Sequence, residues 1–296
     1  MSRERLKGLL SLLATTALWA SSFPFIKIVV SSIGGYRYVW LRGLIALAVL
    51  SPYIALRLKH HSLPRSVVRA GLSVGVAYTA GLWLQGWGTG LTTASKSAFI
   101  TGLNVVFVHI YVALFLHRYT GRLAVSLSLS LAGLYLLTEP ETGVNLGDIL
   151  VLLGAIAWAA QVILVDKASR YDPLLVVFFQ LLPSLVFTGF EAFEQSPLTM
   201  PVESLLAIVY LGTACTIAAF ALQVYGQKFV EPEIASLVFL LEPVLATIFS
   251  HIVLGETMSP REALGASMIA SALLVSSTSI AGFEASSSKE PGRQGK

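Results

Sequence analysis

Charged side chains are scarce in this sequence. Asp, Glu, Lys and Arg make up 12% of its 296 residues, against about 25% in ordinary soluble proteins, and so few charges cannot solvate a 31.7 kDa globule. The single cysteine, Cys215, excludes a disulfide framework and a metal cluster built on cysteines. The sequence also lacks HExxH, Walker and GxGxxG motifs, so it gives no sign of a zinc peptidase or a nucleotide-binding loop. These absences argue against a soluble enzyme.

Apolar residues are abundant instead, and they fall in long runs. They make up 55% of the chain, and the mean hydropathy is +0.76. A helix that crosses a bilayer needs about 20 consecutive apolar residues. Stretches near this length lie at residues 8–30, 36–56, 70–90, 93–116, 121–138, 146–167, 172–193, 203–226, 233–254 and 260–281. The sequence therefore predicts an all-α polytopic membrane protein with ten transmembrane helices.

The positions of the basic residues predict the topology. The formal net charge is +4, and the cytoplasmic loops of membrane proteins carry an excess of Lys and Arg. An N-terminus in the cytoplasm places 15 of the 20 Lys and Arg residues on the cytoplasmic side. We therefore expect a multi-pass protein of the cell (inner) membrane with both termini cytoplasmic. Its expected partners are the lipid bilayer and a small-molecule substrate, not nucleic acid, and the sequence leaves the oligomeric state open, a monomer included.

The two halves of the chain resemble each other at an offset of 138 or 139 residues. Four polar or aromatic positions keep this offset and pair Trp19 with Trp158, Arg42 with Gln180, Gln85 with Gln223, and Asn104 with Glu242. We expect residues 1–140 and 141–281 to form two repeats, followed by a disordered cytoplasmic tail at 282–296. Each repeat holds five spans, an odd number, so the second must be inverted relative to the first. Inverted repeats are typical of secondary transporters that work by alternating access, with the substrate site where the halves meet.

Four segments also carry a family resemblance. They are WASSFPFIK (19–27), SAFITGLNVVFV (97–108), GDILVLLGAIAWAAQVILVDKASRYDPL (147–174) and FALQVYGQKFVEPEIASLVFLLEPVLATIFSHIVLGE (220–256). The chain resembles the EamA family of the drug/metabolite transporter superfamily over nearly its whole length. The resemblance implies ten helices in two five-helix repeats and the transport, often outward, of small metabolites such as amino acids. Family members usually have proline where this chain has His109, and a Gly-Glu pair where it has His117 and Arg118.

Two ionisable residues inside the spans are candidate site residues. An ionisable side chain near the bilayer centre costs about 2.5–3.5 kcal/mol on insertion scales, so such residues face protein or water. Arg42 either extends to the outer interface or anchors a substrate carboxylate, for which a guanidinium is well suited. Glu242 lies near mid-span beside Pro243, which disrupts the local helix. It either makes a structural hydrogen bond or, because burial disfavours a charged carboxylate, couples transport to protons.

Other polar and aromatic side chains extend this candidate pathway. They fall at helical spacing on one face of a span, or they recur in both halves. The full set of expected pathway residues is Thr15, Trp19, Ser22, Arg42, Trp83, Gln85, Trp87, Asn104, Trp158, Gln161, Gln180, Gln223, Tyr225 and Glu242. Hydrogen bonds between helices and tryptophans at the membrane interface are the alternative interpretations of these residues.

The sequence thus predicts a secondary transporter that exports small organic metabolites such as amino acids by alternating access. One alternative is a carrier for nucleotide sugars or other phosphorylated metabolites, which would need more inward-facing basic residues. Alternatives from another class are an integral membrane enzyme, for which the sequence offers no catalytic constellation, and a non-transporting membrane scaffold. No catalytic residue, cofactor or metal is expected, and the substrate, its direction and any coupling ion stay open.

Overall fold

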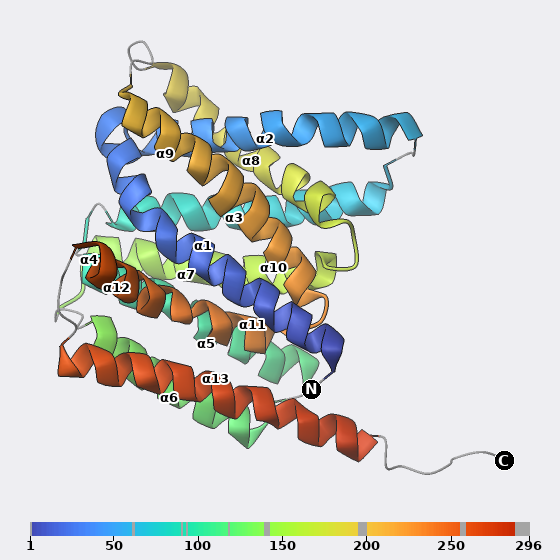
Figure 1. The fold of residues 1–296 in the computed structure, drawn as a ribbon, viewed down its shortest axis with the longest axis vertical. Coiled ribbons are helices and arrows are strands. Elements are labelled where there is room, and N and C mark those ends of the chain that lie inside the picture. The colour runs from blue at the N-terminus through green and yellow to red at the C-terminus, as the bar shows by residue number, and fades with distance from the viewer. Residues whose placement is uncertain are drawn as a thin grey trace.

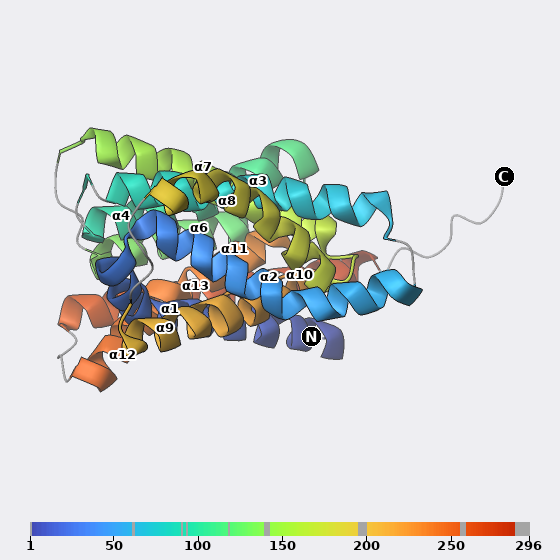
Figure 2. The same ribbon diagram turned by 90° about the horizontal axis from the view of Figure 1, so that it is seen from above.

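The protein is a bundle of helices lying side by side (Figures 1 and 2). A computed structural model describes residues 2–60, 63–89, 91–92, 94–117, 119–138, 143–194, 200–254 and 259–287. All regular structure in this described part is helical, as the sequence predicts. Hydrogen-bonded helix caps set several helix starts. Asn145 and Asp148 form a reciprocal capping box, and Ser259 and Glu262 exchange the same pair of bonds.

Ten membrane-crossing segments follow one another in the described residues. The first half contains α1 (Arg3–Ile33), α2 (Gly35–His60), α3 (Arg65–Thr89), the composite segment of α4 (Ala94–Gly102), α5 (Asn104–Tyr111) and the π-helix η1 (Val112–Leu116), and α6 (Gly121–Thr138). The second half contains α7 (Leu146–Ala168), α8 (Pro173–Glu194), the composite segment of α9 (Val202–Gly212), the π-helix η2 (Thr213–Ala218) and α10 (Ala219–Gln227), the composite segment of α11 (Pro232–Phe239) and α12 (Leu241–Leu254), and α13 (Pro260–Ser287). Each expected span is therefore helical.

Two smaller points concern the lengths of these segments. Within the described residues, six segments are both long and apolar enough to cross a membrane by length and composition. The helix α13 continues to Ser287, so residues 282–287, expected in the tail, are helical. The remainder of the expected tail, 288–296, lies outside the described residues.

The ends of the segments define two sides of the bundle. Arg3, where α1 begins, and Ser287, where α13 ends, lie on one side, at the right in Figure 1. We call this the terminal side and the opposite one the far side. Successive segments run alternately between the two sides, so the second half begins on the far side and is inverted relative to the first.

Contacts between the halves come in exchanged pairs. The first helix of the first half, α1, packs against the third segment of the second half, α9–η2–α10, and α7 packs in return against α3. The second helix α2 packs against α9 and η2, and α8 packs in return against α3. Similarly, α1 contacts α11 and α12 while α7 contacts α4 and α5. Reciprocal contacts of this kind are what a two-fold relation between the halves produces.

Glycines show the same two-fold relation at atomic detail. A Cβ built on Gly88 of α3 would lie 2.7 Å from the Gly147 carbonyl of α7, and one on Gly147 would lie 2.7 Å from the Gly88 carbonyl. Gly226 of α10 and Gly8 of α1 face each other in the same way, at 2.9 and 3.0 Å. Gly226 and Gly147 follow Gly88 and Gly8 by 138 and 139 residues. The two contacts are therefore one contact made twice, and only a residue without a side chain allows such close approach of backbones.

The fourth segment of each half is broken near its middle. Leu103 separates α4 from α5, and Leu240 separates α11 from α12. The two breaks lie at equivalent places in the repeat, although only the second has a proline, Pro243, beside it. Interrupted helices at mid-membrane are how many transporters build their substrate site, because the break leaves backbone polar groups available.

The fifth helices of the two halves, α6 and α13, pack against each other at one edge of the bundle (Figure 1). Gly133 and Gly265 lie at their closest approach, where a Cβ on either would lie 2.6 Å from the carbonyl of the other. A groove of about 450 Å³ also lies along this pair. It is lined by Ala124, Val125, Ser128, Leu129, Ala132 and Met268, none of which is an expected pathway residue.

Candidate substrate site

Arg42 lies inside the bundle, where α2 packs against η2. Its side chain is buried, with 8% exposed, so the guanidinium does not extend to the surface. Nε donates to Thr216 Oγ1, and the two terminal nitrogens donate to the Tyr38 hydroxyl and, at 2.9 Å, to the Cys215 carbonyl. The Thr216 hydroxyl itself donates to the carbonyl of Leu211, five residues back. The π-helix η2 thus presents two acceptors to Arg42, the Thr216 hydroxyl and the Cys215 carbonyl, and an α-helix would use that carbonyl for its own i→i+4 bond.

No carboxylate balances this charge within the described residues. The ion pairs found there join other side chains, and only three of the five guanidinium N–H groups of Arg42 have acceptors. A buried charge without a counter-ion costs several kcal/mol, and neutral acceptors offset only part of this. Because a guanidinium binds a carboxylate through two parallel hydrogen bonds, Arg42 is well suited to bind a substrate anion.

Gln180, the counterpart of Arg42, lies in α8 against α3. Its side chain is fully buried, and neither amide atom has a hydrogen-bond partner in the described part of the chain. Where Arg42 has Thr216, the equivalent position opposite Gln180 is Tyr78. Each unsatisfied buried amide group costs about 1–3 kcal/mol. The side chain of Gln180 is therefore an unsatisfied polar group at the position equivalent to that of Arg42.

Glu242 and its counterpart Asn104 begin the helices that follow the two breaks. Asn104 is the first residue of α5, and its Oδ1 is buried with no partner among the described residues. Glu242 lies in the first turn of α12, where the helix dipole favours a negative charge. It is half-buried, and neither a hydrogen bond nor an ion pair joins it to the described residues. The structural hydrogen bond that the sequence allowed for Glu242 is thus not found in this part of the protein.

A row of five aromatic rings connects the two halves. Phe239 contacts Trp19, Trp19 contacts Phe220, and Phe220 contacts Tyr78, with ring centroids 5.2, 5.1 and 5.2 Å apart. Trp158 lies edge-on to Tyr78 at 5.9 Å. The rings come alternately from the second and the first half, so the row crosses the interface repeatedly. The indole N–H of Trp19 is buried without a partner among the described residues, which leaves one unused donor in an otherwise apolar wall.

Three glutamines make further hydrogen bonds in the site, and one of them, Gln85, bonds across the halves. Gln85 of α3 accepts a hydrogen bond from the indole of Trp158 at 2.8 Å and donates to Thr101 of α4. Gln223 of α10 forms a reciprocal amide pair with Gln161 of α7, both hydrogen bonds being 3.1 Å long. Gln161 and Gln223 are fully buried and Gln85 is half-buried. Gln85 thus bonds to the other half through Trp158, whereas the hydrogen bonds of Gln223 in the described part of the chain stay within the second half.

The remaining expected residues fall into two groups. Thr15 and Ser22 are buried, but their hydroxyls bond to helix carbonyls, Thr15 across to Ala219 of α10. Trp83 donates to Tyr36 at 3.0 Å and stacks beside Trp87. Trp87 is 50% exposed and Tyr225, which packs on Phe229, is 37% exposed. The structure therefore does not bring Trp87 and Tyr225 into the group of buried residues around Arg42 and Trp19.

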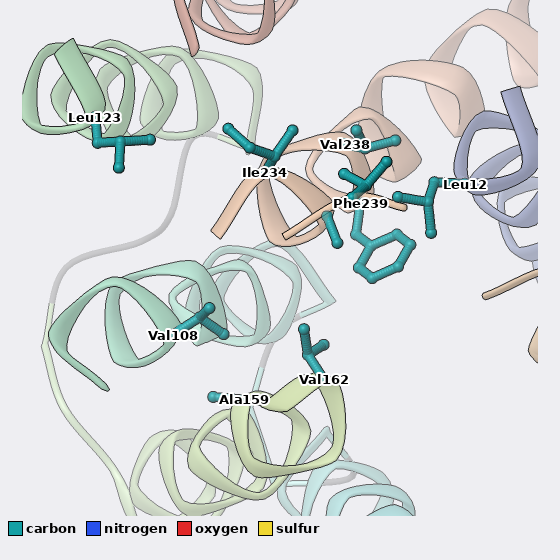
Figure 3. Close-up of a cluster of buried hydrophobic side chains, with 10 residues drawn as sticks. Leu12, Val108, Leu123, Ala159, Val162, Ile234, Val238 and Phe239 are labelled. Carbon is teal, nitrogen blue, oxygen red and sulfur yellow. The ribbon is translucent and has the colours of Figure 1, made fainter. Parts of the chain in front are cut away.

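A cluster of ten apolar side chains closes the terminal side of the bundle. It lies next to the aromatic row and shares Phe239 with it. We call it the apolar plug; it consists of Leu12, Val108, Leu123, Ala159, Val162, Val230, Ile234, Ala235, Val238 and Phe239. Figure 3 shows these side chains converging from α1, α5, α6, α7 and α11. Every residue of α11 is buried, whereas in its counterpart α4 only Ser97 is buried among the side chains described. The two sides are thus not equivalent: the terminal side is closed and the far side is looser.

His109 of α5 forms hydrogen bonds on both sides of its ring beside the apolar plug. Its Nε2 contacts the Glu233 carbonyl at 3.3 Å and must donate, because a carbonyl only accepts. Its Nδ1 therefore accepts from the Tyr119 hydroxyl at 2.9 Å. Burial, and then the negative charge of Glu233, raises the pKa of Tyr119, which keeps that hydroxyl protonated. His109 thus ties α5 to α11 with hydrogen bonds that proline lacks.

Ion pairs across the halves also hold the terminal side closed. Arg5 of α1 lies 3.5 Å from Glu231, just before α11, and Arg57 of α2 lies 3.3 Å from Asp172, just before α8. Asp172 also accepts from the Tyr53 hydroxyl. The equivalent far-side positions of the two acids are Thr93 and Gly34, so the repeat does not duplicate these ion pairs.

Several residues of the site were not predicted from the sequence. Tyr38, Thr216, Phe220 and Phe239 contact predicted residues, but the sequence analysis did not select them. Tyr38 and Phe239 could have been found by helical spacing, since they lie four and three residues from Arg42 and Glu242. The Cys215 carbonyl carries no sequence signal, because it is available to Arg42 through the π-helical turn.

These features define a class of protein: a polytopic membrane protein of two inverted five-helix repeats, with buried polar groups and aromatic rings where the repeats meet. Comparisons with known proteins identify the family. The sequence profile of the EamA-like transporter family matches residues 6–139 and again residues 145–278. The chain therefore belongs to the EamA-like transporter family and is a membrane transporter.

Individual relatives and structures agree with this assignment. The chain is 28% identical over 280 residues to an uncharacterized transporter of Archaeoglobus fulgidus, an alignment covering 94% of this chain and 88% of the relative. It is 26% identical over 283 residues to the uncharacterized inner membrane transporter YedA of Escherichia coli K12, covering 90% and 89% of the two chains. A crystal structure superposes with a TM-score of 0.74 at 19% identity, over 93% of this chain and 98% of the other, which shows a common fold.

Proposed function

We propose that this transporter exports small zwitterionic metabolites, amino acids first among them, by alternating access between its repeats 1–140 and 141–281. One observation supports the substrate class: a buried cation and a half-buried carboxyl lie in the site, and neither has an oppositely charged partner among the described residues. A molecule that carries both a carboxylate and an ammonium supplies both partners. Arg42 binds the carboxylate, and Glu242 binds the ammonium and is the candidate for proton coupling.

A chain of contacts through the middle of α1 connects the two charged groups. The Cys215 carbonyl accepts from Arg42, and the thiol of the same residue donates to the carbonyl of Leu18 in α1 at 3.2 Å. The next residue of α1, Trp19, contacts Phe239, which lies one helical turn before Glu242. The middle of α1 therefore lies between the two charged groups. The aromatic row beside it offers an apolar surface for the substrate side chain.

The inner membrane is the proposed location, with both termini cytoplasmic. The basic residues favour this orientation, and the relative YedA is named an inner membrane transporter. In that orientation the apolar plug and the ion pairs lie on the cytoplasmic side, and we assign the structure to a form closed on that side. An exporter returns through this form after releasing its substrate outside.

Counterflow in liposomes tests the substrate class directly. Purified protein is reconstituted, and the entry of labelled amino acids is measured beside matched analogues that lack one charge: methyl esters without the carboxylate and N-acetyl derivatives without the ammonium. We expect transport of the zwitterions and losses of at least about tenfold for both analogue sets, since each removes a charge-assisted hydrogen bond of about 1.5–3 kcal/mol. Exchange of nucleotide sugars but not of amino acids would establish the phosphorylated-metabolite alternative instead.

Two variants connect the substrate to the proposed residues. Arg42→Lys keeps the charge but loses the bidentate geometry, and we expect it to raise KM for zwitterions by about tenfold, or about 1.4 kcal/mol. Arg170→Gln, on an exposed loop residue, removes a cation elsewhere and is the matched control. Equal activity of Arg42→Lys and Arg170→Gln would reject Arg42 as the carboxylate anchor.

A further inference from the structure

The two repeats differ at one pair of equivalent hydrogen-bonding positions. Toward the far side, the indole N–H of Trp158 donates to the Gln85 side chain at 2.8 Å. Their counterparts Trp19 and Gln223 lie toward the terminal side and could form the same bond. Instead, the Trp19 N–H is buried without a partner among the described residues, and Gln223 pairs with Gln161.

The two pairs lie beside equivalent glycine contacts, although a π-helical turn, η2, precedes Gln223 and the continuous helix α3 has none. Gly147 contacts Gly88 and holds α7 against α3 beside the bonded pair, and Gly8 contacts Gly226 and holds α1 against α10 beside the unbonded one. The amide oxygen of Gln223 is occupied by Gln161. The Gln223 amide also donates to Gln227, and while it is held by Gln161 and Gln227 the indole of Trp19 stays unsatisfied, at a cost in free energy.

We propose that Gln223 is a two-position switch of the transport cycle. It pairs with Gln161 when the terminal side is closed, as here, and with Trp19 when the terminal side is open. The inference rests on the proposed alternating access, in which each inverted repeat adopts the conformation of the other in the opposite state. Gln85 then leaves Trp158 and pairs with Ser22, the counterpart of Gln161. Trp19, Gln161 and Gln223 are thus positioning residues that set the balance between the two states.

Two equivalent positions report the state of each side. Ala98 of α4 is exposed, and its counterpart Ser236 of α11 is fully buried. Each is replaced by cysteine, singly, in a Cys215→Ser background, and the rate of modification by a hydrophilic maleimide is measured in detergent. The rate at Ser236→Cys rises when the terminal side opens, and the rate at Ala98→Cys falls when the far side closes.

The switch predicts opposite effects from two substitutions that each remove one hydrogen bond. Gln161→Met removes a bond of the present state, so the rate at Ser236→Cys rises and the rate at Ala98→Cys falls, each by about two- to tenfold. Trp19→Phe removes the bond of the other state and shifts both rates the opposite way. Trp158→Phe also removes a bond of the present state, the one to Gln85, so it shifts both rates in the same directions as Gln161→Met. Trp40→Phe, the same chemical change on α2 outside the switch, leaves both rates unchanged.

The signs of these shifts decide the proposal, since a purely structural role gives no reason for them to be opposite. Equal signs for Gln161→Met and Trp19→Phe, or unchanged rates in variants that elute as folded monodisperse protein, overturn the switch. Counterflow of labelled amino acids by the same preparations separates the two claims. Transport without opposite shifts rejects the switch and keeps the proposed function. Opposite shifts without transport of any zwitterion keep the switch and reject the substrate class.

Discussion

The close contact between Gly88 and Gly147 leads to a testable prediction about stability. The same helix, α3, also contains a glycine without such a contact, which is the matched control. Gly86 lies two residues from Gly88 on the same helix, yet a Cβ built on it meets nothing within 4 Å. A Cβ on Gly88 would lie 2.7 Å from the Gly147 carbonyl and 2.8 Å from the Val151 nitrogen. Both are backbone atoms and cannot rotate away, so Gly88→Ala must push α3 and α7 apart.

The magnitude follows from two ordinary effects. Overpacking of a close contact costs about 1–3 kcal/mol, which Gly88→Ala pays in full. Gly86→Ala has no clash and gains about 0.5–1 kcal/mol, because alanine loses less backbone freedom than glycine in a helix. Gly88 lies in the same helix and gains a similar amount, so the free energies of unfolding of the two variants should differ by the overpacking cost, about 1–3 kcal/mol.

Thermal melting of the purified protein in detergent, followed by loss of the monodisperse peak, measures this difference. We expect Gly88→Ala to melt several degrees below the parent and Gly86→Ala at or above it. The two-fold relation adds a second requirement. Gly226→Ala is the equivalent change at the other contact, and it should lower the melting temperature by a similar amount. A Gly88→Ala protein as stable as Gly86→Ala would refute the close contact, and a stable Gly226→Ala would refute the symmetry between the two contacts.

Three further predictions concern separate features. His117 has a left-handed backbone with φ of 52°, where a side chain costs about 1 kcal/mol, so His117→Gly should raise the melting temperature, and a drop would contradict this account. Arg5→Glu should open the terminal side by breaking the ion pair with Glu231 and raise the maleimide rate at Ser236→Cys, while adding Glu231→Arg should restore it; failure of the double variant to recover would show that the pair does not act as a latch. Glu242→Gln keeps size and hydrogen-bonding capacity, so it should fold normally and flatten the pH dependence of counterflow, and an unchanged pH profile would make Glu242 structural.

The membrane segments and their inversion were predictable from the sequence. Each span needs only a long apolar run, and an odd number of spans per repeat forces the inversion. The equivalence of Gln85 with Gln223 and of Trp19 with Trp158 was also visible, because these side chains interrupt apolar sequence at a constant offset. Patterns of this kind depend on residue type alone, so they can be recognised in the sequence without a structure.

The details that make the site work were not predictable. The π-helical turn that presents the Cys215 carbonyl to Arg42 depends on backbone geometry, and no residue type marks it. The sequence likewise does not distinguish Trp19 from Trp158, whereas among the described residues only the indole of Trp158 has a hydrogen-bond partner. On the proposed switch, that difference belongs to one conformational state, and a single sequence encodes both states. The exposure of Trp87 depends on how its helix packs against neighbouring helices, which composition does not determine.

The pairing of α6 with α13 gives this edge of the bundle a distinct mechanical role. Each is the fifth helix of its repeat, so exchanging the conformations of the repeats maps the pair onto itself. On the proposed alternating access, the contacts at Gly133 and Gly265 are therefore kept in both states, while the segments farther from this edge move relative to them. Lipids that border α6 and α13 then need no rearrangement during a cycle. On the proposed mechanism, the bilayer resists transport mainly along the other edges of the protein.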